Sequence, residues 1–436
     1  MALPSNKSSL THIPDRLANL VLLLCWSAIL SEGYDVGVMG TIIPVLSVDP
    51  VWHLNPIQIG AMSSAALVGT VIGAAIISLM SDVVGRKRPL IGCVALFSLS
   101  MLAAAWAPSP ELFSIARFIG GVGLGGLIPV AAALTVEYSP LEKRNLNFAL
   151  MYSGYPLGAL LSAFAGILLM KDGNWRPVVA IGGIPLLFTP LMIAMLPESL
   201  DFLLARNLKD KASALLKRHG LSWESVDHSA KASDAPRQSM ISGLIEIFSS
   251  KMIAATILHG IAQFTAMIVI YGLGSWLPQL MRRSGYDLGS SLTFMIVFDL
   301  SSAIGGVLIG RIADHFGTRR TISLSFIVGA FGIAALPFSH VTLINYFFVA
   351  LAGFGSIGVA LVMLGYISGW YGPRARGAAS GYAVLVGRAG AMFGPMLGGV
   401  LASMSLPPLW NFVAFGCVAS VTALVVGVTP RSQAAA

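Results

Sequence analysis

Two carboxylates inside a long apolar segment are the strongest chemical signal in the sequence. Glu32 and Asp35 lie within the segment over residues 17–46. Their spacing of three places both side chains on one face of a helix. A carboxylate in a membrane-spanning helix costs about 2.5 to 3.5 kcal/mol on insertion scales. That face therefore cannot lie against lipid, and we expect it to meet water, a cation or a substrate.

Four more ionisable residues lie inside other apolar segments, namely Arg117, His259, Asp299 and Arg388. With the histidine neutral, the charges at this depth are three acids and two bases, so one carboxylate is in excess. Protonation of one acid removes that excess at the lowest cost. An anionic substrate that engages an arginine would favour the protonation further. The charges therefore indicate a physical route for symport of a proton with an anion.

Each of these residues also has a structural interpretation. Arg117 lies near one end of its span and can extend to the membrane interface. Asp299 can pair locally with a neighbouring serine, and His259 can be a packing residue. Arg388 is the hardest to explain in this way, because it lies about twelve residues into its span, among glycines that leave room beside it.

Several aromatic residues are candidates for stacking on a flat ligand. In membrane helices aromatic residues more often pack against other helices or anchor the chain at the interface, so both roles stay open. The candidates are Tyr34, Tyr155, Phe264, Tyr271, Trp276 and Tyr382.

The composition predicts the elements that position these residues. The 436 residues are 56% hydrophobic and only 11% charged, against about 25% charged in a soluble domain, and the mean hydropathy is +0.81. We predict an all-α polytopic membrane protein with twelve transmembrane helices. The spans are 17–46, 56–80, 89–107, 112–137, 145–170, 177–196, 252–281, 289–313, 321–339, 342–371, 377–402 and 409–428.

The distribution of basic residues predicts the orientation. Twelve spans put both termini on one side, and that side carries 21 of the Lys and Arg residues while the other carries four. Because basic loops stay in the cytoplasm, both termini are expected there. The net charge of +8 is then explained without nucleic-acid binding. We expect an inner-membrane protein with a six-helix bundle over 1–196, a cytoplasmic linker over 197–250 and a second bundle over 251–436.

The two bundles repeat one pattern. A shift of 232 residues superimposes glycines and charged residues: Gly73, Asp82, Gly85, Gly121, Gly123, Gly126, Arg144, Gly158 and Gly166 match Gly305, Asp314, Gly317, Gly353, Gly355, Gly358, Arg376, Gly390 and Gly398. Six spans per copy keep the same orientation in the membrane. The repeat is therefore parallel, as in transporters whose site lies between two pseudo-symmetric halves near the midplane.

Two equivalent loops combine an acid, a turn glycine and a basic cluster. Such loops can form a charge latch between neighbouring helices, or they can only anchor the chain by their positive charge. The residues concerned are Asp82, Gly85 and Arg86 in one loop and Asp314, Gly317 and Arg319 in the other.

These loops resemble the Gly-x-x-x-Asp-(Arg/Lys)-x-Gly-Arg-(Arg/Lys) motif of the major facilitator superfamily. Ser78 and Val83 depart from it in the first copy, and Gly310 restores its glycine in the second. Pro197-Glu198-Ser199, at the end of span six, is similar to the sugar-porter and organic-acid branches.

Within the superfamily, Glu32-Gly33-Tyr34-Asp35 resembles the Asp-Gly-(Tyr/Phe)-Asp motif of the aromatic acid:proton symporters, with glutamate in place of the first aspartate. The fourth span from Arg117 to Gly126, the eleventh from Gly387 to Pro395, and Trp276-Leu277-Pro278 also resemble that family.

The resemblance implies uptake of an aromatic carboxylate of the benzoate or hydroxybenzoate class, driven by the proton gradient. Arg388 is then the first choice for the substrate carboxylate. Arg117 is the second choice, or else the partner of Asp35. Asp35, Glu32 and Asp299 are the candidates for proton coupling. No cofactor is expected, and a monomer is expected to function alone in the lipid bilayer.

Two other functions stay open. A proton-coupled antiporter that exports cations or drugs is compatible with the excess acid, and a membrane receptor could sense aromatic acids without transporting them. An enzyme is least favoured, because no nucleophile–base pair, metal cluster or phosphate-binding loop occurs. Cys25, Cys93 and Cys417 lie in apolar segments and are interpreted as small hydrophobic residues, without disulfides or metal.

Overall fold

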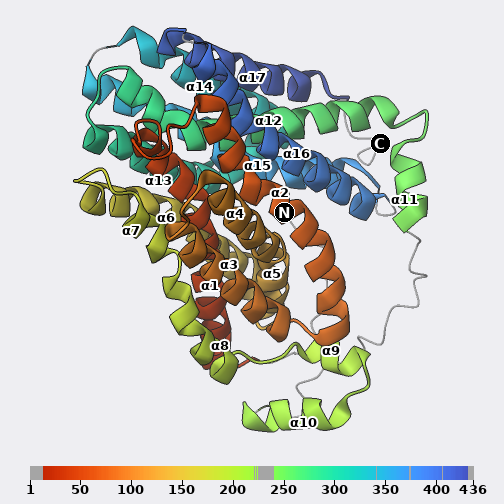
Figure 1. Cartoon of the computed structure of the whole chain (residues 1–436). Coiled ribbons are helices and arrows are strands. Elements are labelled where there is room, and N and C mark those ends of the chain that lie inside the picture. The colour runs from red at the N-terminus through yellow and green to blue at the C-terminus, as the bar shows by residue number, and fades with distance from the viewer. Residues whose placement is uncertain are drawn as a thin grey trace. The chain divides into compact units, whose positions relative to one another are not determined.

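The computed structural model describes residues 13–219, 221, 223, 240–339, 341–372, 375–404 and 406–430, and in these parts regular structure is helical (Figure 1). Part of the predicted linker and the basic residues Lys231, Arg237 and Arg374 fall outside the described residues. The α-helices are α1 Asp15–Leu46, α2 Pro56–Val84, α3 Lys87–Ala105, α4 Pro110–Gly125, α5 Leu127–Glu137, α6 Arg144–Leu169, α7 Arg176–Ile181, α8 Thr189–Met195, α9 Leu200–Ala205, α10 Lys209–Arg218, α11 Met240–Ile247, α12 Ile253–Arg283, α13 Leu288–Phe316, α14 Thr318–Ala335, α15 Thr342–Trp370, α16 Arg376–Ser403 and α17 Pro408–Val428.

The twelve predicted spans are confirmed, since twelve helical stretches of the described chain are long and apolar enough to cross a membrane. Two of them are interrupted. The fourth is α4 followed by α5, with a break at Gly126, because Pro129 cannot donate a hydrogen bond to the carbonyl four residues earlier. The sixth consists of α7, the 3-10 helix η2 over Ile184–Phe188, and α8.

The chain divides into two compact units. The first comprises 1–36, 68–159 and 176–235, and its core joins the start of α1 to α3, α5 and the helices that follow span six. The second comprises 37–67, 160–175 and 236–436, with a core between α12, α14, α15, α16 and α17. The division into 1–196, 197–250 and 251–436 stays a prediction from the sequence.

Hydrogen bonds explain why residues 37–67 belong to the second unit. The Arg282 guanidinium donates to the carbonyl of Pro44 at 2.9 Å, and the Gln279 amide donates to Ser47 Oγ at 3.0 Å. These bonds hold the end of α1 against α12. The hydroxyl of Ser64 in α2 donates to the Met392 carbonyl in α16 at 2.7 Å.

Contacts in the structure repeat at the offset found in the sequence. A Cβ added to Gly123 of α4 would lie 2.9 Å from the Cys93 carbonyl oxygen of α3, and one on Gly355 of α15 would strike the equivalent carbonyl, that of Ser325 in α14. In the same way, Gly73 packs against Val122 and Gly305 against Phe354. Small residues thus let the same helix pairs approach closely in both copies.

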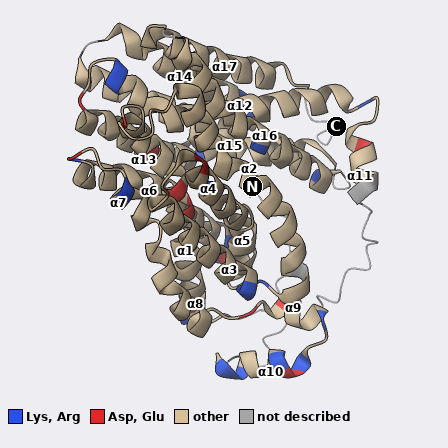
Figure 2. Cartoon of the chain, viewed as in Figure 1, with Lys and Arg blue, Asp and Glu red and all other residues tan. Residues whose placement is uncertain are grey.

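Charged residues are sparse along most of the spans and gather at their ends and on α10 (Figure 2). α10 contains Lys209, Lys211, Lys217 and Arg218. The exceptions within the spans are the residues from which the candidate site is built.

Candidate functional site

Asp35 of α1 and Arg117 of α4 form a buried ion pair. Arg117 Nη1 bonds to Asp35 Oδ1, and its Nη2 donates to the Asp35 carbonyl oxygen at 3.3 Å. The two residues are 2% and 3% exposed. Arg117 therefore turns into the helix bundle instead of extending to the interface, and its charge is cancelled by Asp35.

This pair retains unused hydrogen-bonding capacity. Asp35 Oδ2 and Arg117 Nε are both buried without a hydrogen-bond partner. Since a buried polar atom left unbonded costs about 1 to 3 kcal/mol, the arrangement is costly for a purely structural pair. A polar group that donates to Asp35 Oδ2 and accepts from Arg117 Nε would satisfy both atoms.

The other predicted substrate-binding and proton-coupling residues of the first unit lie on α1 and α6. Glu32 is buried one turn before Asp35 on α1. The hydroxyl of Tyr34 donates to the Val178 carbonyl at 2.8 Å, so this predicted stacking residue ties α1 to α7. Tyr155 of α6 stacks on Tyr152, with ring centroids 5.8 Å apart and an angle of 13° between the planes.

Arg388 of α16 is a half-buried cation without a counter-ion. Within the described chain it makes no ion pair, and its Nε is buried without a hydrogen-bond partner. It lies twelve residues after the start of the 28-residue α16, about 18 Å along the helix. An unpaired guanidinium at mid-helix is suited to binding a carboxylate, because its planar N–H groups match the two carboxylate oxygens.

The glycines around Arg388 serve a purpose different from the one expected. They do not open space beside the arginine, because their Cβ positions are occupied by α12. A Cβ on Gly390 would strike the Phe264 carbonyl, and one on Gly394 would lie 2.7 Å from the Gly272 nitrogen. The glycines therefore allow close packing of α12 on α16, and this packing fixes the helix that carries Arg388.

Asp299 of α13 is also buried, at 5% exposure, and its Oδ2 has no hydrogen-bond partner. It does not pair with the neighbouring serines, because the hydroxyls of Ser301 and Ser302 donate to the Phe298 carbonyl at 2.9 and 2.6 Å. Within the described residues, then, this acid has neither a cation nor a local serine as its partner.

The other predicted residues of the second unit are mostly engaged in packing. Trp276 Nε1 donates to the Pro395 carbonyl at 2.9 Å. The Phe264 ring lies 5.7 Å from Phe393, and the Tyr382 ring contacts Phe248 edge-on at 5.5 Å. His259 is enclosed by the rings of Tyr366, Trp370 and Tyr371. Its Nδ1 lies 3.2 Å from the Tyr371 hydroxyl.

The first predicted latch is built around an acid that the sequence reasoning missed. Arg86 pairs with Glu137 at 2.6 Å, and Glu137 also accepts hydrogen bonds from Ser199 Oγ and from the backbone nitrogens of Leu200 and Asp201. Glu137 thereby caps α9. Glu137 ends the fourth span, and the offset of 232 pairs it with Gly369. An acid in the first copy that has no acidic counterpart in the second is the sequence signal that could have identified this residue.

Glu198 closes the same network. Its Oε1 accepts from the backbone nitrogens of Arg86 and Lys87 at 2.8 and 3.0 Å. The hydroxyl of Tyr138 donates to the Glu198 carbonyl, and burial, with the nearby carboxylates, raises the pKa of that tyrosine. Gly85 has a φ of +97°, and a Cβ there would meet the Glu198 carboxylate.

The second latch is held differently. Asp314 is exposed, and no ion pair to it occurs in the described parts of the chain. Arg319 donates to the Thr429 carbonyl at 2.6 Å, as the equivalent Lys87 does to Ile193 at 2.7 Å. Gly317 has a φ of +88°. The side chain of Asp82 falls outside the described residues.

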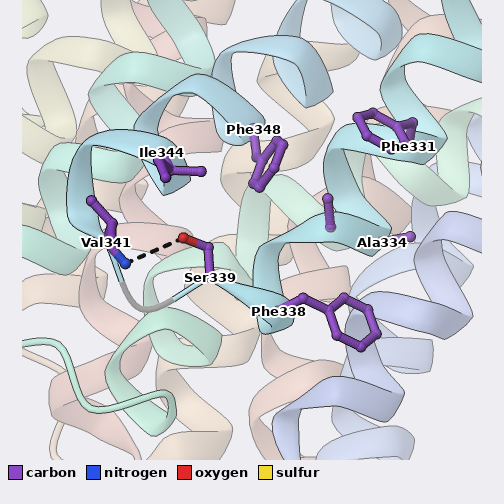
Figure 3. A pocket seen from close by; sticks show the side chains of 8 residues that line it. Phe331, Ala334, Phe338, Ser339, Val341, Ile344 and Phe348 are labelled. Carbon is purple, nitrogen blue, oxygen red and sulfur yellow. Dashed lines mark hydrogen bonds between the residues drawn. The ribbon is translucent and has the colours of Figure 1, made fainter.

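An apolar hollow of about 670 Å³ lies elsewhere, between α14, α15 and the short 3-10 helix Leu336–Phe338 (Figure 3). It contains none of the predicted site residues and no charged side chain. Its lining is Phe331, Ala334, Ala335, Phe338, Ser339, Val341, Ile344 and Phe348. Because a carboxylate needs positive charge or several donors to leave water, we do not assign the substrate site to this hollow.

Comparison with known proteins agrees with this fold. The sequence profile described as "Major Facilitator Superfamily" matches residues 25–301 and 295–435. The chain belongs to the major facilitator superfamily. The xylose transporter XylE from E. coli, in a partially occluded inward-open conformation, superimposes with a TM-score of 0.74 over 94% of this chain and 97% of its own, at 18% identity. The predicted all-α fold of two pseudo-symmetric six-helix bundles is thereby confirmed.

The curated relatives of this superfamily member confirm the expected branch. The benzoate transport protein of Acinetobacter baylyi is 32% identical over 90% of this chain and 85% of its own length. The gentisate transporter of Corynebacterium glutamicum is 31% identical over 94% and 87%, and the gallate transporter of Pseudomonas putida is 31% identical over 93% and 90%. All three are named as transporters of aromatic acids.

Proposed function

We propose that this multi-pass membrane protein imports an aromatic carboxylate together with a proton, by alternating access. The observation that carries the proposal is the unpaired guanidinium of Arg388, half-buried at mid-helix in α16. The names of the curated relatives support the substrate class, since they transport benzoate, gentisate and gallate. Arg388 would bind the carboxylate, and the aromatic side chain of Phe264, on the neighbouring α12, would be available to the ring.

The proton has three candidate carriers. Arg117 already neutralises Asp35, so that the remaining mid-span charges are those of Glu32, Asp299 and Arg388. Binding of an anion at Arg388 would bring the sum of these formal charges from −1 to −2. Protonation of Asp299, which lacks a cationic partner among the described residues, restores the balance at the lowest cost. Asp35 and Glu32 would take part through the Arg117 pair.

The same proposal includes the membrane location, the gating loops and the oligomeric state. The excess of basic residues beside the termini favours the inner membrane, with both termini in the cytoplasm. The loops with Arg86 and Arg319 would gate the movement of the two halves. Nothing in the proposed mechanism needs a second copy of the chain, and a monomer would be sufficient.

The test is uptake of labelled benzoate and 4-hydroxybenzoate by proteoliposomes, with and without an inward proton gradient. We expect gradient-driven uptake by the wild type and a loss of more than tenfold in Arg388→Ala. Arg311→Ala is the matched control, because Arg311 is an exposed arginine at the end of α13. Binding without uptake in the wild type would favour a receptor, and a preference for cations would favour an antiporter.

A further inference from the structure

Gln263 of α12 is a buried polar residue to which the mechanism above gives no role. It is 4% exposed, and its Oε1 has no hydrogen-bond partner. A primary amide can make four hydrogen bonds, so a core position without even one to its oxygen is unusual. The sequence reasoning missed this residue because it carries no charge.

The position of Gln263 connects it to Arg388. A Cβ added to Gly387 would lie 3.0 Å from Gln263 Nε2 and 3.1 Å from its Cγ. The amide therefore rests against α16 at the residue immediately before Arg388. Gln263 is ten residues after the start of the 31-residue α12, about 15 Å along it, so both residues lie well inside their helices.

The chemistry of the amide complements that of the arginine. Arg388 offers positive charge and donors, which suit a carboxylate. The Gln263 oxygen offers an acceptor, and an acceptor is of no use to an ionised carboxylate. It suits a hydroxyl group, which can donate one hydrogen bond and accept another from the amide nitrogen.

We propose that Gln263 is a specificity-determining residue that hydrogen-bonds a ring hydroxyl of the substrate while Arg388 holds its carboxylate. The proposal rests on the proposed function and deepens it, because it selects monohydroxylated aromatic acids over the unsubstituted acid. A hydroxylated acid would satisfy the buried oxygen, whereas benzoate would leave it unbonded. Since the amide and the arginine are fixed on two packed helices, the preference falls on one ring position.

The test is competition for uptake of labelled benzoate by the three monohydroxybenzoates, in proteoliposomes of the wild type and of Gln263→Leu. In the wild type, we expect at least one isomer to compete about tenfold more strongly than unlabelled benzoate. In Gln263→Leu, that advantage should disappear while benzoate uptake persists, because one neutral hydrogen bond to a buried partner is worth about tenfold. Gln263→Asn, with a shorter reach, should retain only part of it.

Thr265→Val is the control for packing. Thr265 lies on the same helix, and its hydroxyl already bonds to Ile261 and Thr422, so this variant should keep the wild-type order of isomers. Persistent benzoate uptake in Gln263→Leu shows that the variant folds. If Gln263→Leu weakened binding of benzoate and of the three monohydroxybenzoates equally, or left the order of the isomers unchanged, the role of Gln263 would be overturned. The proposed function would stay intact. Absence of benzoate uptake in the wild type would overturn the proposed function itself.

Discussion

At the scale of single residues, the Asp35–Arg117 pair shows how a buried carboxylate can be ion-paired and still have one oxygen available for another hydrogen bond. One oxygen of Asp35 bonds to Arg117, while the other has no partner. Removing one member of a buried pair leaves the other charge uncompensated and costs about 3 to 5 kcal/mol. Replacing both members by neutral groups avoids that penalty. The two kinds of change therefore separate the structural contribution of the pair from its contribution to coupling.

We predict that Asp35→Asn loses proton-driven accumulation but retains exchange of bound substrate, and that it is thermally less stable than the wild type. Asp35→Asn combined with Arg117→Gln should recover most of the stability, because neither buried charge is then left without its partner. Thermal unfolding in detergent measures the first property, and counterflow and accumulation assays in proteoliposomes measure the second. Full accumulation by Asp35→Asn would exclude a role of this carboxylate in coupling.

At the scale of elements, the contact between α12 and α16 places Gln263 against Gly387, the residue that precedes Arg388. The glycines of α16 that face α12 recur at intervals of three and four residues, at Gly387, Gly390 and Gly394. This spacing puts them on one helix face. A glycine in a helix interior costs about 1 kcal/mol relative to alanine, so a face built from three glycines indicates that close approach of the two backbones is worth more than that penalty.

We predict opposite effects for the same substitution at two positions of α16. Gly390→Ala should destabilise the protein by about 1 to 3 kcal/mol, because its Cβ strikes the Phe264 carbonyl and forces the helices apart. Gly381→Ala should be neutral or stabilising by up to about 1 kcal/mol, since no atom lies within 4 Å of its Cβ position. Unfolding temperatures in one detergent compare them, and equal shifts would contradict the argument.

At the scale of the whole molecule, the membrane spans and the internal repeat could be predicted from the sequence. Hydropathy alone located the twelve spans, because each needs only its own length and composition. The offset of 232 likewise predicted a repeated architecture. Contacts seen only in the structure follow the same offset: the Tyr138 hydroxyl donates to the Glu198 carbonyl, and Trp370 Nε1 donates to the equivalent carbonyl of Pro430. Prediction of the spans and of the repeat needs no knowledge of which side chains meet.

Features that depend on a particular neighbour could not be predicted. Glu137 ends an apolar span, and its role follows from residues some sixty positions later, at the start of α9. Gln263 became a candidate only when its amide was found unbonded beside Gly387. The glycines near Arg388 were expected to leave space, but α12 fills it, because a sequence shows the absence of a side chain and not what replaces it.

The charge balance of the whole molecule leads to the last prediction. With Arg117 cancelling Asp35, the mid-span charges of Glu32, Asp299 and Arg388 sum to −1, and a bound carboxylate makes the sum −2. One proton restores −1, and the substrate and proton then cross together. In Asp299→Asn the sum is already −1 with the anion bound, so the proton is no longer needed.

We therefore expect wild-type uptake to fall as the external pH rises, because fewer carriers bind the coupled proton. Uptake by Asp299→Asn should be downhill only, and insensitive to both the proton gradient and the external pH. Asp172→Asn, at an exposed loop position, is the matched control and should keep the wild-type profile. Initial rates of benzoate uptake over a range of external pH, at fixed internal pH, measure this. If Asp299→Asn still accumulates substrate against its gradient, the coupled proton is carried elsewhere, and Glu32 becomes the acid to change next.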